Sequence, residues 1–189
     1  MKLRPRPTRI PTRRAGRGQA LVEFALVFPI FVVLLLGIIE FAFLFNALLS
    51  VNYSARDAAL AAAEAGNGVG ADCVILDTVD TSVGPPTSDN RIGTVEIYQA
   101  TPNGVLIGSP TLYTRTGSTT CTFVDGTTLT VPYTRTSNNY AEANRCNVLG
   151  GCGVGHPTVD NVAVKVTYTH PHVTPLQNSL VGGTTLTFD

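Results

Sequence analysis

The chain has 189 residues, which is room for one modest domain and a membrane anchor. Its formal charge is zero, but residues 1–18 hold seven basic and no acidic residues. The remainder holds six basic and thirteen acidic residues, so without residues 1–18 its formal charge is −7. A basic tail can bind nucleic acid, but this one adjoins a long apolar run. We therefore interpret it as the cytoplasmic flank of a membrane helix and expect no nucleic-acid partner.

The apolar run covers residues 20–51 and contains two carboxylates, Glu23 and Glu40. As a helix these residues would be about 48 Å long, whereas a bilayer core is about 30 Å thick. The segment can therefore span a membrane and project beyond it. Pro29 lies inside the run and lacks a backbone N–H, so it would kink or loosen the helix. The alternative is that it has no effect, because neighbouring groups in membrane helices satisfy the freed backbone. An Ala-rich stretch continues the pattern to residue 65, where Gly66 predicts a left-handed helix end.

A cleaved secretory signal is the alternative for this segment, because Ala59-Leu60-Ala61 has the small-x-small pattern of a cleavage site. The apolar run is too long for that layout and carries a glutamate in its core. Arg13-Arg14 resembles a twin-arginine signal only by the pair itself. We therefore favour a retained membrane helix with its N-terminus in the cytoplasm and the C-terminal domain outside.

The rest of the chain is rich in Thr, Val, Gly and Pro, and its short alternating runs predict β-strands. We expect strands at 73–81, 93–100, 105–109, 119–124, 127–131, 162–169 and 184–188, and loops at 84–86 and 134–161. Asp125-Gly126 is typical of a tight hairpin turn. The expected fold class is α+β: a long N-terminal transmembrane helix, packed by its C-terminal half against a small antiparallel β-sheet. The predicted regions are a leader (1–18), the helix (19–66) and an extracytoplasmic β-rich domain (67–189).

Four cysteines, Cys73, Cys121, Cys146 and Cys152, follow the apolar run. An even number in an exported domain predicts up to two disulfides, with three possible connectivities. The short spacing favours Cys146 with Cys152, which leaves Cys73 with Cys121. Zinc is the alternative, but the cysteines are dispersed and show no CxxC spacing.

The sequence shows no catalytic motif or cofactor fingerprint. His156, His170 and His172 suggest a metal site, but the sequence places no third and fourth ligand beside the His170-Pro171-His172 pair. The glycines at 66, 68 and 70 follow a helix instead of opening one, which is the wrong context for a phosphate loop. We therefore expect no metal, no cofactor and no enzyme activity.

Gly18-Gln19, followed by Glu23 at the fifth position after the glycine and by a membrane-length apolar helix, resembles the TadE-like pseudopilins of tight-adherence (Flp) pilus systems. Further similar stretches are 37–41, 56–59 and 164–168, together with Pro171 and Pro175-Leu176. The resemblance covers residues 16–66 well and 160–178 in part, and the middle of the chain resembles no family.

The resemblance implies a type IV pilus-like precursor that a prepilin peptidase cuts between Gly18 and Gln19. It implies other pilins and pseudopilins, pilus assembly platform proteins and the lipid bilayer as partners, and a place in the pilus as a minor subunit. Glu23 would pair with the new N-terminal ammonium, on its own or a neighbouring subunit. The alternative is that Glu23 reaches water at the cytoplasmic interface.

Glu40 lies 17 residues after Glu23, on a helix face about 100° away. It would contact another subunit or a platform protein, or it would mark the outer membrane boundary. Two other functions stay open: a single-pass anchored binding or adhesion domain outside any pilus, and an anchored exported enzyme. An uncut leader would favour the first of these, and a pocket with converging polar groups the second.

Overall fold

A computed structural model describes residues 16–147, 158–172 and 185–188 of the chain. It divides into two compact units, residues 1–39 and 40–189. Helix α1 (Gly16–Ala65) runs through both units, and Gly66, with a φ angle of 56°, ends it as predicted. The boundary falls inside this helix because residues from Ala47 onward belong to the core of the second unit.

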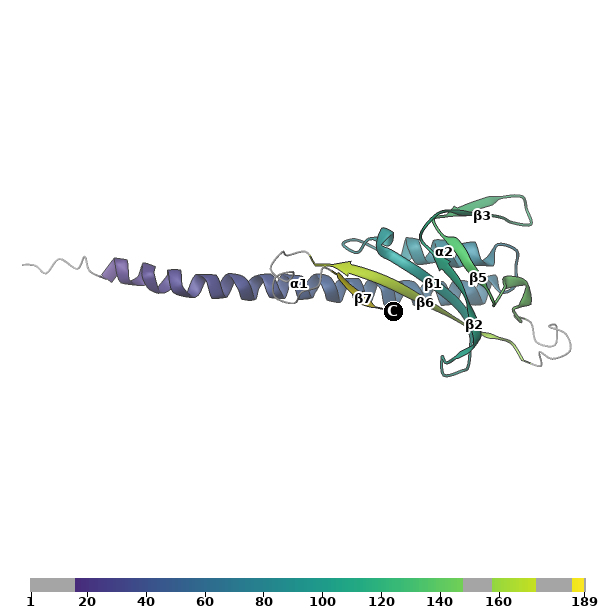
Figure 1. Cartoon of the computed structure of the whole chain (residues 1–189), viewed down its shortest axis with the longest axis horizontal. Helices are drawn as coiled ribbons and strands as arrows, with labels where there is room; N and C mark the ends of the chain where they lie inside the picture. The colour runs from purple at the N-terminus through teal and green to yellow at the C-terminus, as the bar shows by residue number, and fades with distance from the viewer. Residues whose placement is uncertain (1–15, 148–157, 173–184, 189) are drawn as a thin grey trace, which may run out of the picture. The chain divides into compact units, whose positions relative to one another are not determined.

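The second unit contains a five-stranded antiparallel sheet in the order β5-β2-β1-β6-β7. Its strands are β1 (Ile92–Ala100), β2 (Leu106–Thr114), β5 (Thr134–Asn138), β6 (Asn161–Pro171) and β7 (Thr185–Phe188). A separate hairpin joins β3 (Thr119–Thr122) to β4 (Thr128–Val131). Figure 1 shows the sheet beside the C-terminal half of α1 and the hairpin next to α2. The α+β fold with a long N-terminal helix is therefore confirmed.

Two predicted elements were wrong. Residues 73–81 are not a strand but part of helix α2 (Ala71–Ser82), which begins at Gly70 with a φ angle of 85°. Its buried side chains follow a helical spacing along one face, so packing overrides the β-preference of its Val, Ile and Thr residues. The segment 134–161 is not wholly a loop, because β5 pairs with β2 at the edge of the sheet. Its side chains are mostly exposed, which removes the alternating pattern that predicts a strand.

The core lies between α1, α2 and the sheet. On α1, Ala47, Val51, Ser54, Ala58 and Ala62 form a buried stripe at helical spacing, and Ala58 and Ala62 have no exposed surface. The Ser54 hydroxyl donates a hydrogen bond to the carbonyl of Val79 at 2.8 Å, which joins α1 to α2. Small side chains on this stripe allow α2 to approach closely.

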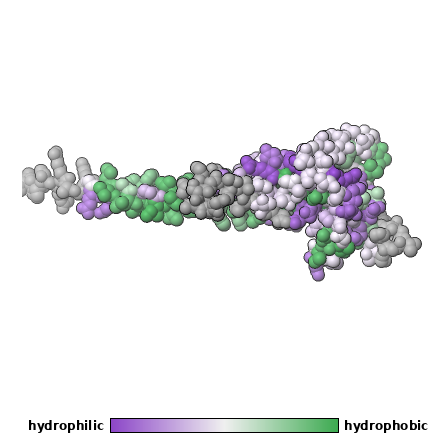
Figure 2. Space-filling view, viewed as in Figure 1, coloured by the Kyte–Doolittle hydropathy of each residue, from purple (hydrophilic) through white to green (hydrophobic). Residues whose placement is uncertain are grey.

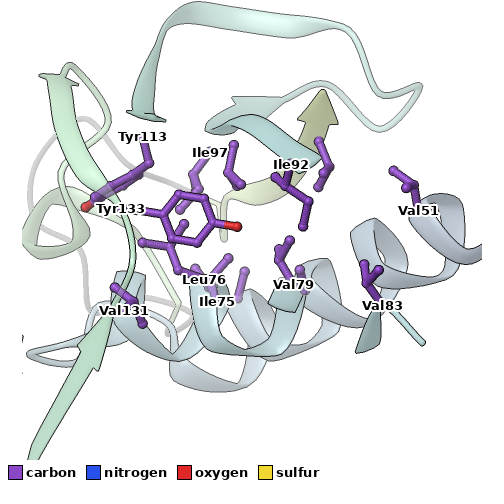
Figure 3. Close-up of a cluster of buried hydrophobic side chains, with 14 of the residues drawn as sticks. Val51, Ile75, Leu76, Val79, Val83, Ile92, Ile97, Tyr113, Val131 and Tyr133 are labelled. Atoms are coloured by element: carbon purple, nitrogen blue, oxygen red, sulfur yellow. The ribbon is translucent and has the colours of Figure 1, made fainter. Parts of the chain in front are cut away.

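The sheet contributes the opposite wall of the core. Figure 3 shows Ile75, Leu76 and Val79 of α2 pointing toward Ile92 and Ile97 of β1. In a regular strand, residues 92 and 95 would point to opposite faces of the sheet. The β1–β6 register shifts between Ile92 and Thr94, and the side chains at 92, 95 and 97 are all buried. Each fully buried Ile, Leu or Val contributes about 1.5–3 kcal/mol to stability. This core holds the domain together independently of the apolar segment before residue 40.

Candidate functional site

The part of α1 before Glu40 has an apolar surface all round. Nearly every side chain from Gln19 to Ile39 is exposed, and Figure 2 shows hydrophobic residues along this part of the helix. The 22 residues from Gly18 to Ile39 would be about 33 Å long, close to the thickness of a bilayer core. Among the described residues, α1 is the one helix long and apolar enough to cross a membrane, with a mean hydropathy of 2.8 in its most apolar window. A helix that is hydrophobic on every side needs an apolar environment.

Gly18 lies within the first turns of α1, where the fold makes no demand for glycine. A Cβ atom added at Gly18 would have no neighbouring atom within 4 Å, and its φ angle is not in the left-handed region. Glycine is also a poor helix former, less favourable than alanine by about 0.8–1.0 kcal/mol. Neither the packing nor the backbone geometry of the chain therefore requires glycine at this position.

Glu23 lies directly over the turn that contains Gln19. The Gln19 side-chain amide (Nε2) donates a hydrogen bond to Glu23 Oε1 at 3.1 Å. This contact follows from helix geometry, because residues i and i+4 share a face and side chains tilt toward the N-terminus. Glu23 is therefore placed to accept a donor at residue 19.

Pro29 occurs inside a helix that continues without a break from Gly16 to Ala65. Together with Ile30, Val33 and Leu34 it lines an open, wholly apolar hollow of about 300 Å³ on the helix surface. The predicted loosening of the helix at this residue stays a prediction.

Glu40 has a different environment from Glu23. Its side chain is 3% exposed, and its Oε1 atom lies 3.3 Å from Nδ1 of His172, whose side chain is 5% exposed. The structure thus covers Glu40 with its own chain, at the first residue of the second unit. Sequence analysis placed His172 in a possible metal site and did not identify it as the partner of Glu40.

One disulfide joins Cys73 of α2 to Cys121 of β3, which is one of the connectivities that the sequence left open. Cys146 is also disulfide-bonded. Its predicted partner, Cys152, and the predicted ligand His156 lie outside the described residues. Within the described part of the chain, no group of three His, Cys, Asp or Glu side chains is arranged to hold a metal ion.

A buried polar cluster that the sequence did not predict links the start of α2 to the segment after β5. Arg145 forms an ion pair with Asp72, and their side chains are 1% and 4% exposed. The Tyr113 hydroxyl donates to the second oxygen of Asp72 at 2.7 Å. Burial, reinforced by the Asp72 carboxylate, raises the pKa of Tyr113, which keeps its proton on the donor. The Glu142 carboxylate accepts from the backbone N–H of Gly70 and Asp72 at the N-terminus of α2.

This cluster is a structural connection and not a catalytic arrangement. Nearby, Asp160 accepts hydrogen bonds from the side chains of Gln99 and Tyr140 and from the backbone of Cys146. The Arg145 guanidinium also stacks 5.2 Å from the centre of the Tyr140 ring. Each carboxylate is occupied by donors of its own chain. The cluster therefore fixes a segment that has little regular secondary structure.

Comparison with known proteins finds a family similarity over most of α1. Residues 18–60 match the family model described as TadE-like protein. The N-terminal helix of this chain is TadE-like. No curated protein and no solved structure matches the chain.

The TadE-like match begins at Gly18 and ends close to the C-terminus of α1. It includes Glu23, Glu40 and most of the stripe that packs into the second unit. The sheet, α2 and the buried Asp72–Arg145 pair lie outside it. The TadE-like match is thus confined to the helix.

Proposed function

We propose that this TadE-like protein is a minor pilin-like subunit of a tight-adherence (Flp-type) pilus. Its precursor spans the cytoplasmic membrane once, and a prepilin peptidase cleaves it between Gly18 and Gln19. The observation that carries the proposal is that the TadE-like match starts at Gly18, a glycine that the fold does not require. Glu23 follows five residues later, in an exposed apolar helix.

The charge distribution supports the proposed orientation. The seven basic residues of the leader favour the cytoplasmic side, by the preference of positive charge for that side. The domain of residues 40–189 is then outside, where disulfides such as Cys73–Cys121 form and persist. Cleavage on the cytoplasmic side would give Gln19 a free ammonium group.

Cleavage would also change the partner available to Glu23. In the precursor its carboxylate accepts from the neutral side-chain amide of Gln19. A carboxylate in the centre of a bilayer costs about 2.5–3.5 kcal/mol on insertion scales, and an ammonium partner offsets this cost better than an amide does. We propose that the ammonium is supplied by the same subunit or by a neighbouring pilin, and that platform proteins assemble the subunits once this pairing is possible.

The alternative of an ordinary secretory signal cut after Ala61 conflicts with the packing of the domain. Ala47, Val51 and Ala58 lie before that position, and all three are in the hydrophobic core. Removing them would expose the faces of α2 and the sheet that they cover. Retention of α1 is therefore the more stable arrangement for the fold.

A single-pass anchored binding or adhesion domain is the second candidate. It is favoured by an exposed apolar group at the start of β2, where Val105, Leu106 and Ile107 are 62%, 44% and 43% exposed. Exposed apolar groups of this kind often mark interaction surfaces. This function does not require cleavage at Gly18.

Mass spectrometry of the N-terminus of the protein from native membranes tests the proposal. The wild-type chain is expected to begin at Gln19, and a Gly18→Leu variant at Met1. Gly37→Leu is the matched control, because Gly37 lies in the same helix and also has no atom within 4 Å of an added Cβ. Processing of Gly37→Leu at Gln19 would show that the loss is specific to residue 18.

Other N-termini would contradict the proposal. A wild-type chain that keeps Met1 would favour the anchored binding domain as the function. A terminus at Ala62 would indicate a secretory signal. Glu23→Gln separates cleavage from assembly: this variant is expected to be cut normally but to be lost from sheared surface filaments. Incorporation of Glu23→Gln at the wild-type level would refute the pairing role.

A further inference from the structure

A cavity of about 310 Å³ lies where β6, the loop after α2 and α1 meet in the second unit. Phe43, Pro86 and Pro171 supply apolar walls, and Thr87, Arg91 and His170 supply polar groups. A water molecule occupies about 30 Å³ in the liquid, so the space far exceeds that of one bridging water. The cavity therefore suits a ligand that has both an apolar and a polar part.

His170 is the buried polar group of this cavity. The residue is 6% exposed, and its Nε2 atom has no hydrogen-bond partner among the described residues. A buried ring nitrogen left without a partner is unfavourable, so such atoms usually face a ligand or an ordered water. Burial lowers the pKa of His170, and Arg91 and His172 act in the same direction while Glu40 opposes them. At neutral pH the imidazole is therefore uncharged, and an Nε2–H tautomer can donate one hydrogen bond.

Arg91 gives the cavity its preference for an anion. It carries the positive charge among the described residues that line the cavity, and it is exposed at the cavity mouth. The Glu40 carboxylate acts electrostatically on His170, but it does not line the cavity and lies against His172. A guanidinium, a hydroxyl and an imidazole N–H together match the oxygens of a phosphate group.

Chain connectivity keeps this cavity near the membrane. Phe43 follows Ile39, the last residue of the first unit, by four residues. Four residues span at most about 14 Å even when fully extended. Whatever the orientation of the domain, the Phe43 wall of the cavity cannot lie far from the level of the lipid headgroups. A free phosphate ion would leave the apolar walls in contact with water, whereas a phospholipid would cover them with its glycerol and first methylene groups.

We infer that this cavity binds the headgroup of an anionic phospholipid. The phosphate contacts Arg91 and His170, and the glycerol end lies against Phe43, Pro86 and Pro171. This inference rests on the membrane insertion in the proposed function. The site would hold the second unit against the outer surface of the bilayer before the subunit leaves the membrane.

The test is native mass spectrometry of the full chain in detergent, titrated with short-chain phosphatidylglycerol. Arg91→Gln and His170→Leu are each expected to weaken binding about tenfold or more, since the first loses the guanidinium charge and the second loses the N–H donor to a charged group. Arg56→Gln is the matched control, because Arg56 is an exposed arginine of α1 that does not line the cavity. Arg91→Gln is the decisive variant, because an exposed side chain can be replaced without disturbing the core.

Competition experiments distinguish the ligands. Phosphatidylglycerol is expected to bind more tightly than phosphatidylcholine, and inorganic phosphate is expected to compete only weakly. Equal binding by wild type and Arg91→Gln, or inorganic phosphate binding as tightly as the lipid, would overturn the inference. If another pilin subunit displaces the lipid and its binding also requires Arg91, the cavity is a contact between subunits and the inference is wrong.

The N-terminus of Arg91→Gln separates this inference from the proposed function. Cleavage at Gln19 in a variant that has lost lipid binding leaves the proposed function intact. A wild-type chain found in the soluble fraction would contradict both the lipid-binding inference and the proposed function.

Discussion

Breaking the buried Asp72–Arg145 pair should be one of the most damaging changes in the domain outside its apolar core. In Arg145→Met, the Asp72 carboxylate keeps the Tyr113 hydroxyl but loses its counter-ion in a site where it is 4% exposed. In Asp72→Asn, a guanidinium that is 1% exposed loses its carboxylate, and its Nε and Nη1 atoms already lack partners among the described residues. Removing one member of a buried ion pair costs about 3–5 kcal/mol of unfolding free energy. We expect each single variant to lose stability in this range.

The double variant Asp72→Asn/Arg145→Met should recover most of this loss. It leaves no buried charge, and the Asn side chain can still accept from Tyr113. Replacement of a whole buried pair by uncharged groups of similar volume is often nearly neutral. We therefore expect the double variant to lie within about 2 kcal/mol of the wild type, with a coupling energy of about 3 kcal/mol or more.

Guanidinium chloride unfolding of the full chain in detergent, followed by tyrosine fluorescence, measures these free energies. The chain has six tyrosines and no tryptophan, so the signal comes from residues such as Tyr113 and Tyr140 beside the pair. Asp89→Asn is the control, because Asp89 pairs with Arg115 at 2.9 Å but is 47% exposed. It should cost less than about 1 kcal/mol. The reasoning is refuted if Arg145→Met costs no more than Asp89→Asn, or if the two single losses simply add.

Three further changes test other parts of the structure by the same unfolding measurement. Cys73→Ala/Cys121→Ala opens a loop with a sequence separation of 48 residues and should cost about 4 kcal/mol by the loop-entropy relation; an unchanged midpoint would contradict it. Ala58→Leu should cost about 1–3 kcal/mol or more, because Ala58 has no exposed surface, whereas Leu60→Ala on the exposed face should change stability by less than about 0.5 kcal/mol. Burial holds the pKa of His170 low in the folded state. The neutral His170 side chain therefore contributes fully to the free energy of unfolding above about pH 6.5, and this contribution is lost as the pH falls below that value. Stability should therefore decrease between about pH 7.5 and 5, with a flatter profile in His170→Gln; identical profiles would rule out this residue as the source.

The sequence predicts those elements whose signal is local. The apolar run, its end at Gly66, the hairpin around Asp125-Gly126 and the alternating strand within β6 depend on short-range patterns, and all are present in the structure. Helix α2 was mistaken for a strand because its β-branched residues suggest a pleated surface. The spacing of its buried residues becomes a clear helical stripe only once α1 and the sheet are in place.

The polar contacts could not be predicted from the sequence, because they too depend on the folded arrangement. Asp72 and Arg145 are 73 positions apart and belong to no motif. Glu40 and His172 come from opposite ends of the second unit. A charged residue in a sequence of this kind predicts a solvated surface by default, since burial is rare without a partner. The partner is defined only by the fold.

The two carboxylates of α1 illustrate how the same residue type acquires different roles on one helix. Glu40 lies against a histidine of its own chain and is covered by the domain. Glu23 lies in an apolar segment where it accepts a hydrogen bond from the neutral amide of Gln19, one turn away. The cost of placing Glu23 in lipid is thus the part that the fold of a single chain leaves least compensated. In the proposed function, an ammonium created at residue 19 supplies that compensation, and removal of the leader is then a condition for assembly.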